Sequence, residues 1–165
     1  MKHAPKNSPG QALGRTLGLG AVAGVRSMSA PALLSRAASR GSIEGIEGTP
    51  FAFLASPRVA RILTVLAVGE ALADKLPFAP DRISAPGLVG RMASGGLVGA
   101  TLFAAAKRRA AIGAGLGLLA SAAASYPSYY LRVQIQEKLN LPNWALGLVE
   151  DALAEGTGLL VLRKG

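Results

Sequence analysis

The chain has 165 residues, enough for one domain, and half of them are hydrophobic while only 16% are charged. Ordinary soluble domains carry about 25% charged residues, so this composition favours a membrane protein over a soluble one. The chain has no cysteine, which excludes disulfides, thiol catalysis and thiolate metal sites. Its net charge is +9, but the basic residues flank apolar stretches instead of clustering with aromatic residues, which favours lipid headgroups over nucleic acid as the partner.

Apolar stretches of suitable length recur along the chain. They predict five transmembrane segments, at about residues 11–34, 58–76, 86–106, 110–132 and 142–162. No convincing cleavage site follows the first stretch, so it is expected to stay as a membrane helix. The predicted fold is therefore all-α, a polytopic bundle of transmembrane helices that forms a single membrane domain over residues 1–165.

Two of these segments are interrupted. In the first, residues 16–25 are too few to cross about 30 Å of hydrocarbon at 1.5 Å per residue. The chain must therefore continue past the interruption or dip into the membrane and return. Proline disfavours helix at the residue before it and removes a backbone donor, so both segments are predicted to be broken helices. The break residues are Ser27, Ser29 and Pro31 in the first segment, and Tyr126 and Pro127 in the fourth.

Glycines recur at four-residue intervals, which is the spacing of helix faces that pack closely in lipid. The runs are Gly10, Gly14 and Gly18; Gly20 and Gly24; Gly95 and Gly99; and Gly113 and Gly117. No strand precedes these glycines and the dinucleotide spacing is missed, so helix packing is the preferred interpretation.

Self-comparison predicts an internal repeat. Residues 68–74 match residues 149–155, and residues 29–36 more weakly match residues 125–132. The prediction is a first repeat over about 11–77, a linking helix over about 86–106 and a second repeat over about 110–163. One intervening crossing would invert the second repeat, an arrangement that recurs in secondary transporters.

Acidic residues occupy matching positions in the two repeats. Glu70 and Asp74 are four residues apart, as are Asp151 and Glu155, so each pair lies on one helix face. Charges inside a membrane are costly and are candidates for function. The candidate ion- or substrate-binding residues are Glu70, Asp74, Glu150, Asp151 and Glu155, and the candidate counter-charges are Arg26, Arg91 and Arg132. Converging carboxylates suit a cation or a shared proton; the alternative is that these charges form structural ion pairs, such as Glu70 with Arg26.

Enzymatic chemistry has little support. The only histidine, His3, lies in a polar N-terminal tail, and the serines lie beside helix breaks, where hydroxyls commonly satisfy backbone groups. No catalytic residue and no cofactor are expected, and the sequence does not settle whether a metal binds. Counting basic residues on each side leaves the membrane orientation undecided, although the tight cluster at 107–109 slightly favours an N-out, C-in arrangement. Dual insertion and an antiparallel homodimer stay open.

Three motifs carry a family resemblance: Gly-Val-Arg-Ser-Met-Ser-Ala-Pro at 24–31, Leu-Ala-Ser-Pro at 54–57, and Glu-Ala-Leu-Ala-Asp-Lys-Leu-Pro at 70–77. They resemble bacterial membrane proteins of the domain-of-unknown-function family numbered 4126, from about Leu13 to the C-terminus. The resemblance implies a small multi-pass inner-membrane protein of unassigned activity. A fainter similarity links the acidic segments to the Glu-x-Gly-Asp-Lys motifs of cation/proton exchangers, although the acid spacing here is four instead of three and no lysine follows Glu155.

Two functional hypotheses result. The favoured one is a small inverted-repeat membrane transporter or permease, proton- or cation-coupled, with a small ion or solute as its unidentified substrate. The alternative is a non-transporting membrane scaffold or assembly protein whose buried charges are structural.

Overall fold

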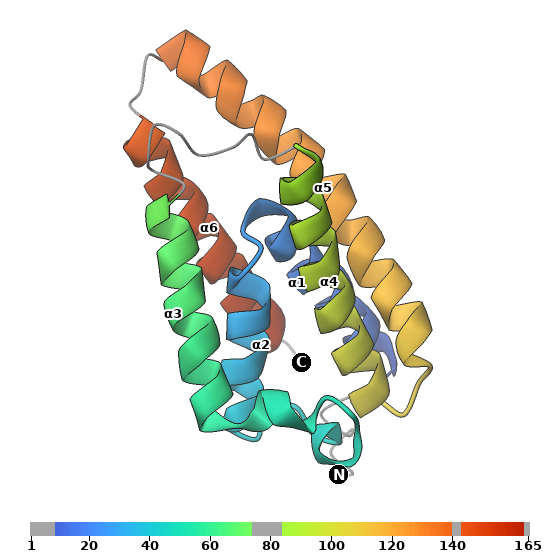
Figure 1. Ribbon diagram of the computed structural model, residues 1–165. Helices are drawn as coiled ribbons and strands as arrows, with labels where there is room; N and C mark the ends of the chain where they lie inside the picture. Colours follow the sequence, from blue (N-terminus) through green and yellow to red (C-terminus); the bar gives the residue numbers. More distant parts are fainter. Residues whose placement is uncertain (1–8, 74–83, 140–142, 164–165) are drawn as a thin grey trace.

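The computed structural model describes residues 9–73, 84–139 and 143–163 of the chain (Figure 1). Across these residues the fold is all-α, as the sequence predicts, and no strand occurs. The helices are α1 (Pro9–Val25), α2 (Ser29–Ser39), α3 (Pro57–Ala73), α4 (Ala85–Ala105), α5 (Ala110–Leu139) and α6 (Asn143–Arg163), with two short 3₁₀ turns, η1 (Ile46–Gly48) and η2 (Ala52–Ala55).

The first predicted segment is a helical hairpin. The chain reverses direction between α1 and α2, so α2 returns towards the end at which α1 begins (Figure 1). Leu19 of α1 and Leu33 of α2 both lie beside Gly158 of α6, as two antiparallel arms of one hairpin require. Of the two paths that the sequence left open, the chain takes the returning one.

The break is shorter than predicted. Ser29 and Pro31 belong to the first turn of α2, and the non-helical residues end at Met28. The first N–H groups of a helix have no acceptor within the helix, so a proline in this turn sacrifices no hydrogen bond. The prediction that Ser29 and Pro31 interrupt the helix is therefore wrong, while Ser27 does lie in the turn.

The second predicted break, at Tyr126 and Pro127, is also wrong. Helix α5 runs through Pro127 without interruption and is about 45 Å long. Two serine hydroxyls donate to carbonyls next to the proline: Ser125 to the Ser121 oxygen at 2.8 Å, and Ser128 to the Ser125 oxygen at 2.9 Å. Neither hydroxyl reaches the Ala123 carbonyl, which is the acceptor that the missing Pro127 N–H would have used, so the helix continues without that one hydrogen bond.

Glycines bring three helices into backbone contact, as their spacing predicts. A Cβ atom on Gly99 of α4 would overlap the Gly113 carbonyl of α5, and one on Gly117 would overlap the Gly95 carbonyl. Helix α1 packs on α5 in the same way, where a Cβ atom on Gly24 would overlap the Ser121 carbonyl. Helices α1, α4 and α5 therefore form one tightly packed layer.

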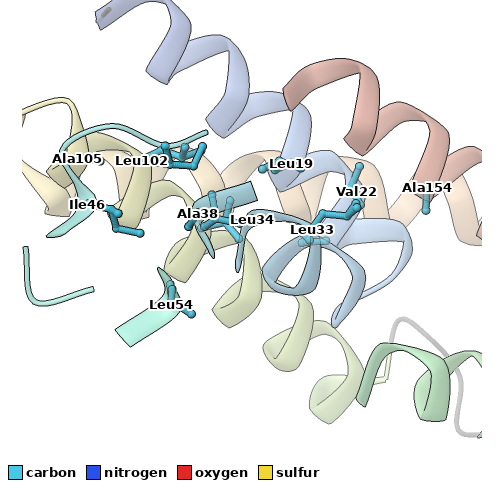
Figure 2. Close-up of a cluster of buried hydrophobic side chains, with 14 residues drawn as sticks. Leu19, Val22, Leu33, Leu34, Ala38, Ile46, Leu54, Leu102, Ala105 and Ala154 are labelled. Carbon is cyan, nitrogen blue, oxygen red and sulfur yellow. The ribbon is translucent and has the colours of Figure 1, made fainter. Parts of the chain in front are cut away.

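A single hydrophobic core joins this layer to the hairpin (Figure 2). Leu19 of α1 and Leu34 of α2 are fully buried there, together with Leu102 of α4. The loop between α2 and α3 closes one end of the core through Ile46 and Leu54, which come from η1 and η2. The core thus holds α2 against α1 and α4, and α3 packs on the other side of α2.

Basic side chains gather at the lower end of the molecule in Figure 1, where α2 and α6 end, α3 begins and α4 turns into α5. Eight of them are exposed: Arg36, Arg40, Arg58, Arg61, Lys107, Arg108, Arg109 and Arg163. Exposed charge on the described residues is therefore distributed unevenly between the two ends of the bundle.

Two helices are long and apolar enough to cross a membrane, α4 and the Ala110–Lys138 part of α5. Only 22% of an apolar 18-residue stretch within α5 is buried inside the molecule, so α5 turns apolar side chains outward. Helix α3 also exposes large apolar residues, including Val65 and Leu72. These features weakly indicate a membrane protein. Because the first predicted segment is a returning hairpin, only the other four segments are left as crossings, and those stay a prediction.

The helix packing gives a direct test. Replacing Gly99 or Gly117 with alanine forces α4 and α5 apart, and overpacking of this kind typically destabilises by about 1–3 kcal/mol. We expect a lower thermal unfolding midpoint for each variant in detergent. The matched control is Gly115→Ala, also on α5, where an added Cβ atom meets nothing within 4 Å. Equal effects of Gly117→Ala and Gly115→Ala would contradict the proposed backbone contact.

Candidate functional site

The turn between α1 and α2 leaves backbone N–H groups without acceptors of their own, because the first N–H groups of any helix lack them. Glu70 of α3 accepts these hydrogen bonds. Its Oε1 atom accepts from the Ser27 N–H at 3.0 Å and from the Ser27 hydroxyl, and its Oε2 atom accepts from the Met28 N–H at 2.8 Å. A carboxylate at a helix N-terminus also interacts favourably with the helix dipole. Glu70 therefore caps α2 from a different helix.

Arg26 ends the other arm of the hairpin and is 1% exposed. Its Nε atom lies 2.7 Å from Asp151 Oδ1 on α6, and its Nη2 atom donates to the Gly147 carbonyl at 3.2 Å. A buried guanidinium is costly unless it is paired and hydrogen-bonded, and these contacts supply a counter-charge and a hydrogen bond. Arg26 and Asp151 thereby fix the hairpin turn to α6.

The two acids at matching repeat positions thus contact one turn from two sides. Glu70 reaches it from α3 and Asp151 from α6, and α3 and α6 run in opposite directions along α2 (Figure 1). Arg26 has the position expected of a counter-charge, with Asp151 as its carboxylate. The hydrogen bonds of Glu70 go instead to Ser27 and Met28, so the alternative of a Glu70–Arg26 pair is not what the structure displays.

A cavity of about 320 Å³ lies beside this turn, among α2, α3 and α6. Most of its wall is apolar, from residues such as Leu33 and Ala67, while Asp151 and Glu155 contribute carboxylates one helical turn apart. Arg36 of α2 adds a positive charge. Within the described part of the chain, the Glu155 carboxylate has no hydrogen bond or ion pair. The cavity wall therefore contains one carboxylate that is ion-paired, Asp151, and one that is free to bind a ligand, Glu155.

The remaining predicted residues lie elsewhere. Glu150 faces away from the cavity and forms an ion pair with Arg132 at 2.7 Å, which joins α6 to the part of α5 beyond Pro127. Arg91 is buried on α4 and does not line the cavity. Asp74 lies outside the described residues.

Sequence reasoning missed Arg36 as a site residue. A signal was present, because Arg36 lies in the segment that matches 125–132 and aligns there with Arg132. In the described ranges, no three acidic, histidine or cysteine side chains lie together as a metal site would require.

The fold defines a class of protein: an all-α bundle built around a returning helical hairpin whose turn is bound by acids from two antiparallel helices. Residues 13–163 match the family described as Domain of unknown function (DUF4126), and the chain belongs to that family. This confirms the family resemblance carried by the motifs. Comparison with curated proteins found no match, and comparison with solved structures found none either.

The capping role of Glu70 predicts a large stability effect. Glu70→Ala leaves two backbone N–H groups and a hydroxyl without their acceptor, and hydrogen bonds to charged groups contribute about 1.5–3 kcal/mol each. We expect the thermal unfolding midpoint in detergent to fall by many degrees. Glu155→Ala is the control, since Glu155 caps nothing, and it should change the midpoint little. Similar midpoints for the two variants would refute the capping role.

Proposed function

We propose that the protein is a small multi-pass membrane transporter or permease that carries an ion or small solute with proton or cation coupling. The observation that carries the proposal is the cavity beside the hairpin turn, in which Asp151 and Glu155 face apolar walls. Its volume is at the lower end of the range for small-ligand sites, which suits a small substrate.

A membrane placement follows from the surface. Helices α3, α5 and α6 expose large apolar side chains, and the exposed basic residues gather at one end. By the positive-inside rule that end faces the cytoplasm. The hairpin then enters from the cytoplasmic side and returns to it, while α3, α4, α5 and α6 cross the bilayer. Non-helical backbone at membrane depth is tolerated where protein buries it. At this turn Glu70 accepts a hydrogen bond from the backbone of Met28, and the Arg26–Asp151 pair holds the turn against α6.

The chemistry assigns different tasks to the acids. Arg26 keeps Asp151 engaged, so a cation that enters the cavity competes with Arg26 for this carboxylate. Glu155 is available to take up a proton or to hold the cation directly. Binding would therefore loosen the Arg26–Asp151 contact and couple occupancy of the cavity to the position of the hairpin turn. No covalent step is involved.

The second candidate is a membrane scaffold or assembly protein, and a specific observation favours it. Glu70 and Glu150 are both engaged in contacts that join one helix to another, which is what structural charges do. On this account the outward apolar faces bind partner subunits or a second copy of the chain. The two accounts differ in whether any solute moves.

Transport by the purified protein tests the proposal. Proteoliposomes loaded with pyranine and given an inward gradient of Na⁺, K⁺ or Mn²⁺ should show a change in internal pH with at least one cation. Glu155→Gln and Asp151→Asn should each slow that change about tenfold or more, because a coupling acid must be able to ionise.

The control is Glu47→Gln, which removes an exposed carboxylate from the η1 turn and should leave the rate unchanged. Wild-type vesicles that respond to none of the three gradients would overturn cation–proton coupling. Normal rates for both cavity variants would overturn the assigned site. Loss of stability in Asp151→Asn with no transport by the wild type is the scaffold result.

A further inference from the structure

A second hollow lies on the surface between α2 and α3, nearer the basic end. It has a volume of about 660 Å³ and is lined by Arg36 and Arg40 of α2 and by Arg61 of α3. The hydroxyls of Ser39 and Thr64 lie in the same wall. Both hydroxyls already donate to carbonyls of their own helices, Ser39 to Arg36 and Thr64 to Ala60. The donors around the hollow are therefore the three guanidinium groups, which suit a phosphate.

None of these three arginines has an ion-pair partner among the described residues. By contrast, the less exposed Arg26 and Arg132 each form an ion pair, with Asp151 and Glu150 respectively. A smaller adjoining hollow of about 150 Å³ repeats Arg36 and Arg40 and adds Arg163 of α6. Positive charge is therefore concentrated around this hollow without an internal anion to balance it.

An apolar surface leads away from the arginines. Arg61, Val65, Val68 and Leu72 follow one another on a single face of α3. The three apolar residues are more than half exposed, at 69%, 55% and 61%. Val65 lines the arginine hollow itself, and Val68 and Leu72 lie in the wall of the neighbouring cavity. Along this face of α3 a basic residue is followed by apolar residues. A ligand with a negatively charged head and a long apolar tail would match that order.

The arginine hollow and the apolar face of α3 together form a groove. We propose that this groove binds an anionic phospholipid, with its phosphate among Arg36, Arg40 and Arg61 and an acyl chain along the Val65–Val68–Leu72 face. Basic hollows between membrane helices on the cytoplasmic side are suited to such headgroups. A soluble phosphate would use only the arginines and leave the apolar face bare, so the lipid is the better match. The proposal does not depend on transport, because its readout is lipid occupancy.

Native mass spectrometry of the full chain in neutral detergent measures that occupancy. The probes are phosphatidylglycerol, phosphatidylcholine with the same acyl chains, and glycerol 3-phosphate as a head without a tail. We expect phosphatidylglycerol to bind about tenfold or more tightly than either of the others, since charge and tail both contribute.

Two triple variants distinguish specific binding in the groove from a general effect of positive charge at this end of the molecule. Arg36→Gln/Arg40→Gln/Arg61→Gln removes three positive charges from the groove, and Lys107→Gln/Arg108→Gln/Arg109→Gln removes three from the same end outside it. The first should weaken phosphatidylglycerol binding about tenfold or more and the second less than about twofold. If the first triple variant does not fold, Arg61→Gln against Arg109→Gln makes the same comparison at two exposed positions.

A second pair of variants tests the contribution of the apolar Val65–Val68–Leu72 face. Val65→Asn should weaken phosphatidylglycerol binding, while Ile112→Asn, at an exposed position on α5, should not. Equal binding of the two phospholipids, or equal losses in the two triple variants, would overturn the proposal. Binding of glycerol 3-phosphate as tightly as phosphatidylglycerol would also overturn it, and would make the groove a site for soluble phosphate.

Discussion

The structure depends on how the turn between α1 and α2 satisfies its polar groups. A chain that reverses direction inside an apolar bundle exposes backbone N–H groups and, here, a guanidinium, and each costs free energy unless it is paired. Glu70 accepts from Ser27 and Met28, and Asp151 pairs with Arg26. These two acids come from α3 and α6, so the positions of four helices are tied to one short segment. The candidate site is next to this segment because Asp151, which pairs with Arg26 at the turn, also lines the cavity.

Glycine makes this arrangement geometrically accessible. The backbones of α4 and α5 are in contact at Gly99 and Gly113, and α1 packs equally closely on α5 at Gly24. The first arm of the hairpin is therefore fixed directly on α5. The end of α1 is thereby held in place, and Arg26 projects from it towards Gly147 and Asp151 on α6. The close glycine packing of α1 on α5 thus helps to position Arg26, which follows the end of α1.

Local patterns in the sequence predicted much of this. Hydrophobic runs bounded by proline and charge predicted the helices, and four-residue glycine spacing predicted the close contacts of α1, α4 and α5. The aligned acids predicted one shared binding site, which stays a prediction; in the structure Glu70 and Asp151 contact the same turn through different partners. The errors concern features that depend on packing. Pro127 was predicted to break α5, but α5 packs along α1 and α4 and stays helical through the proline. The sequence did not settle which acid pairs with Arg26, and only the fold decides that Asp151 does so while Glu70 accepts from Ser27 and Met28.

In the proposed membrane placement, the first apolar segment enters the bilayer and returns instead of crossing it. The chain has no cysteine, so single cysteines report their side of the membrane without background. Gly10→Cys lies at the start of α1, the first arm of the hairpin, and Ser42→Cys follows α2, and both positions are exposed. In sealed vesicles of known orientation, an impermeant maleimide should label both from the same side, together with Lys107→Cys in the α4–α5 turn. Labelling of Gly10→Cys and Ser42→Cys from opposite sides would contradict the returning hairpin.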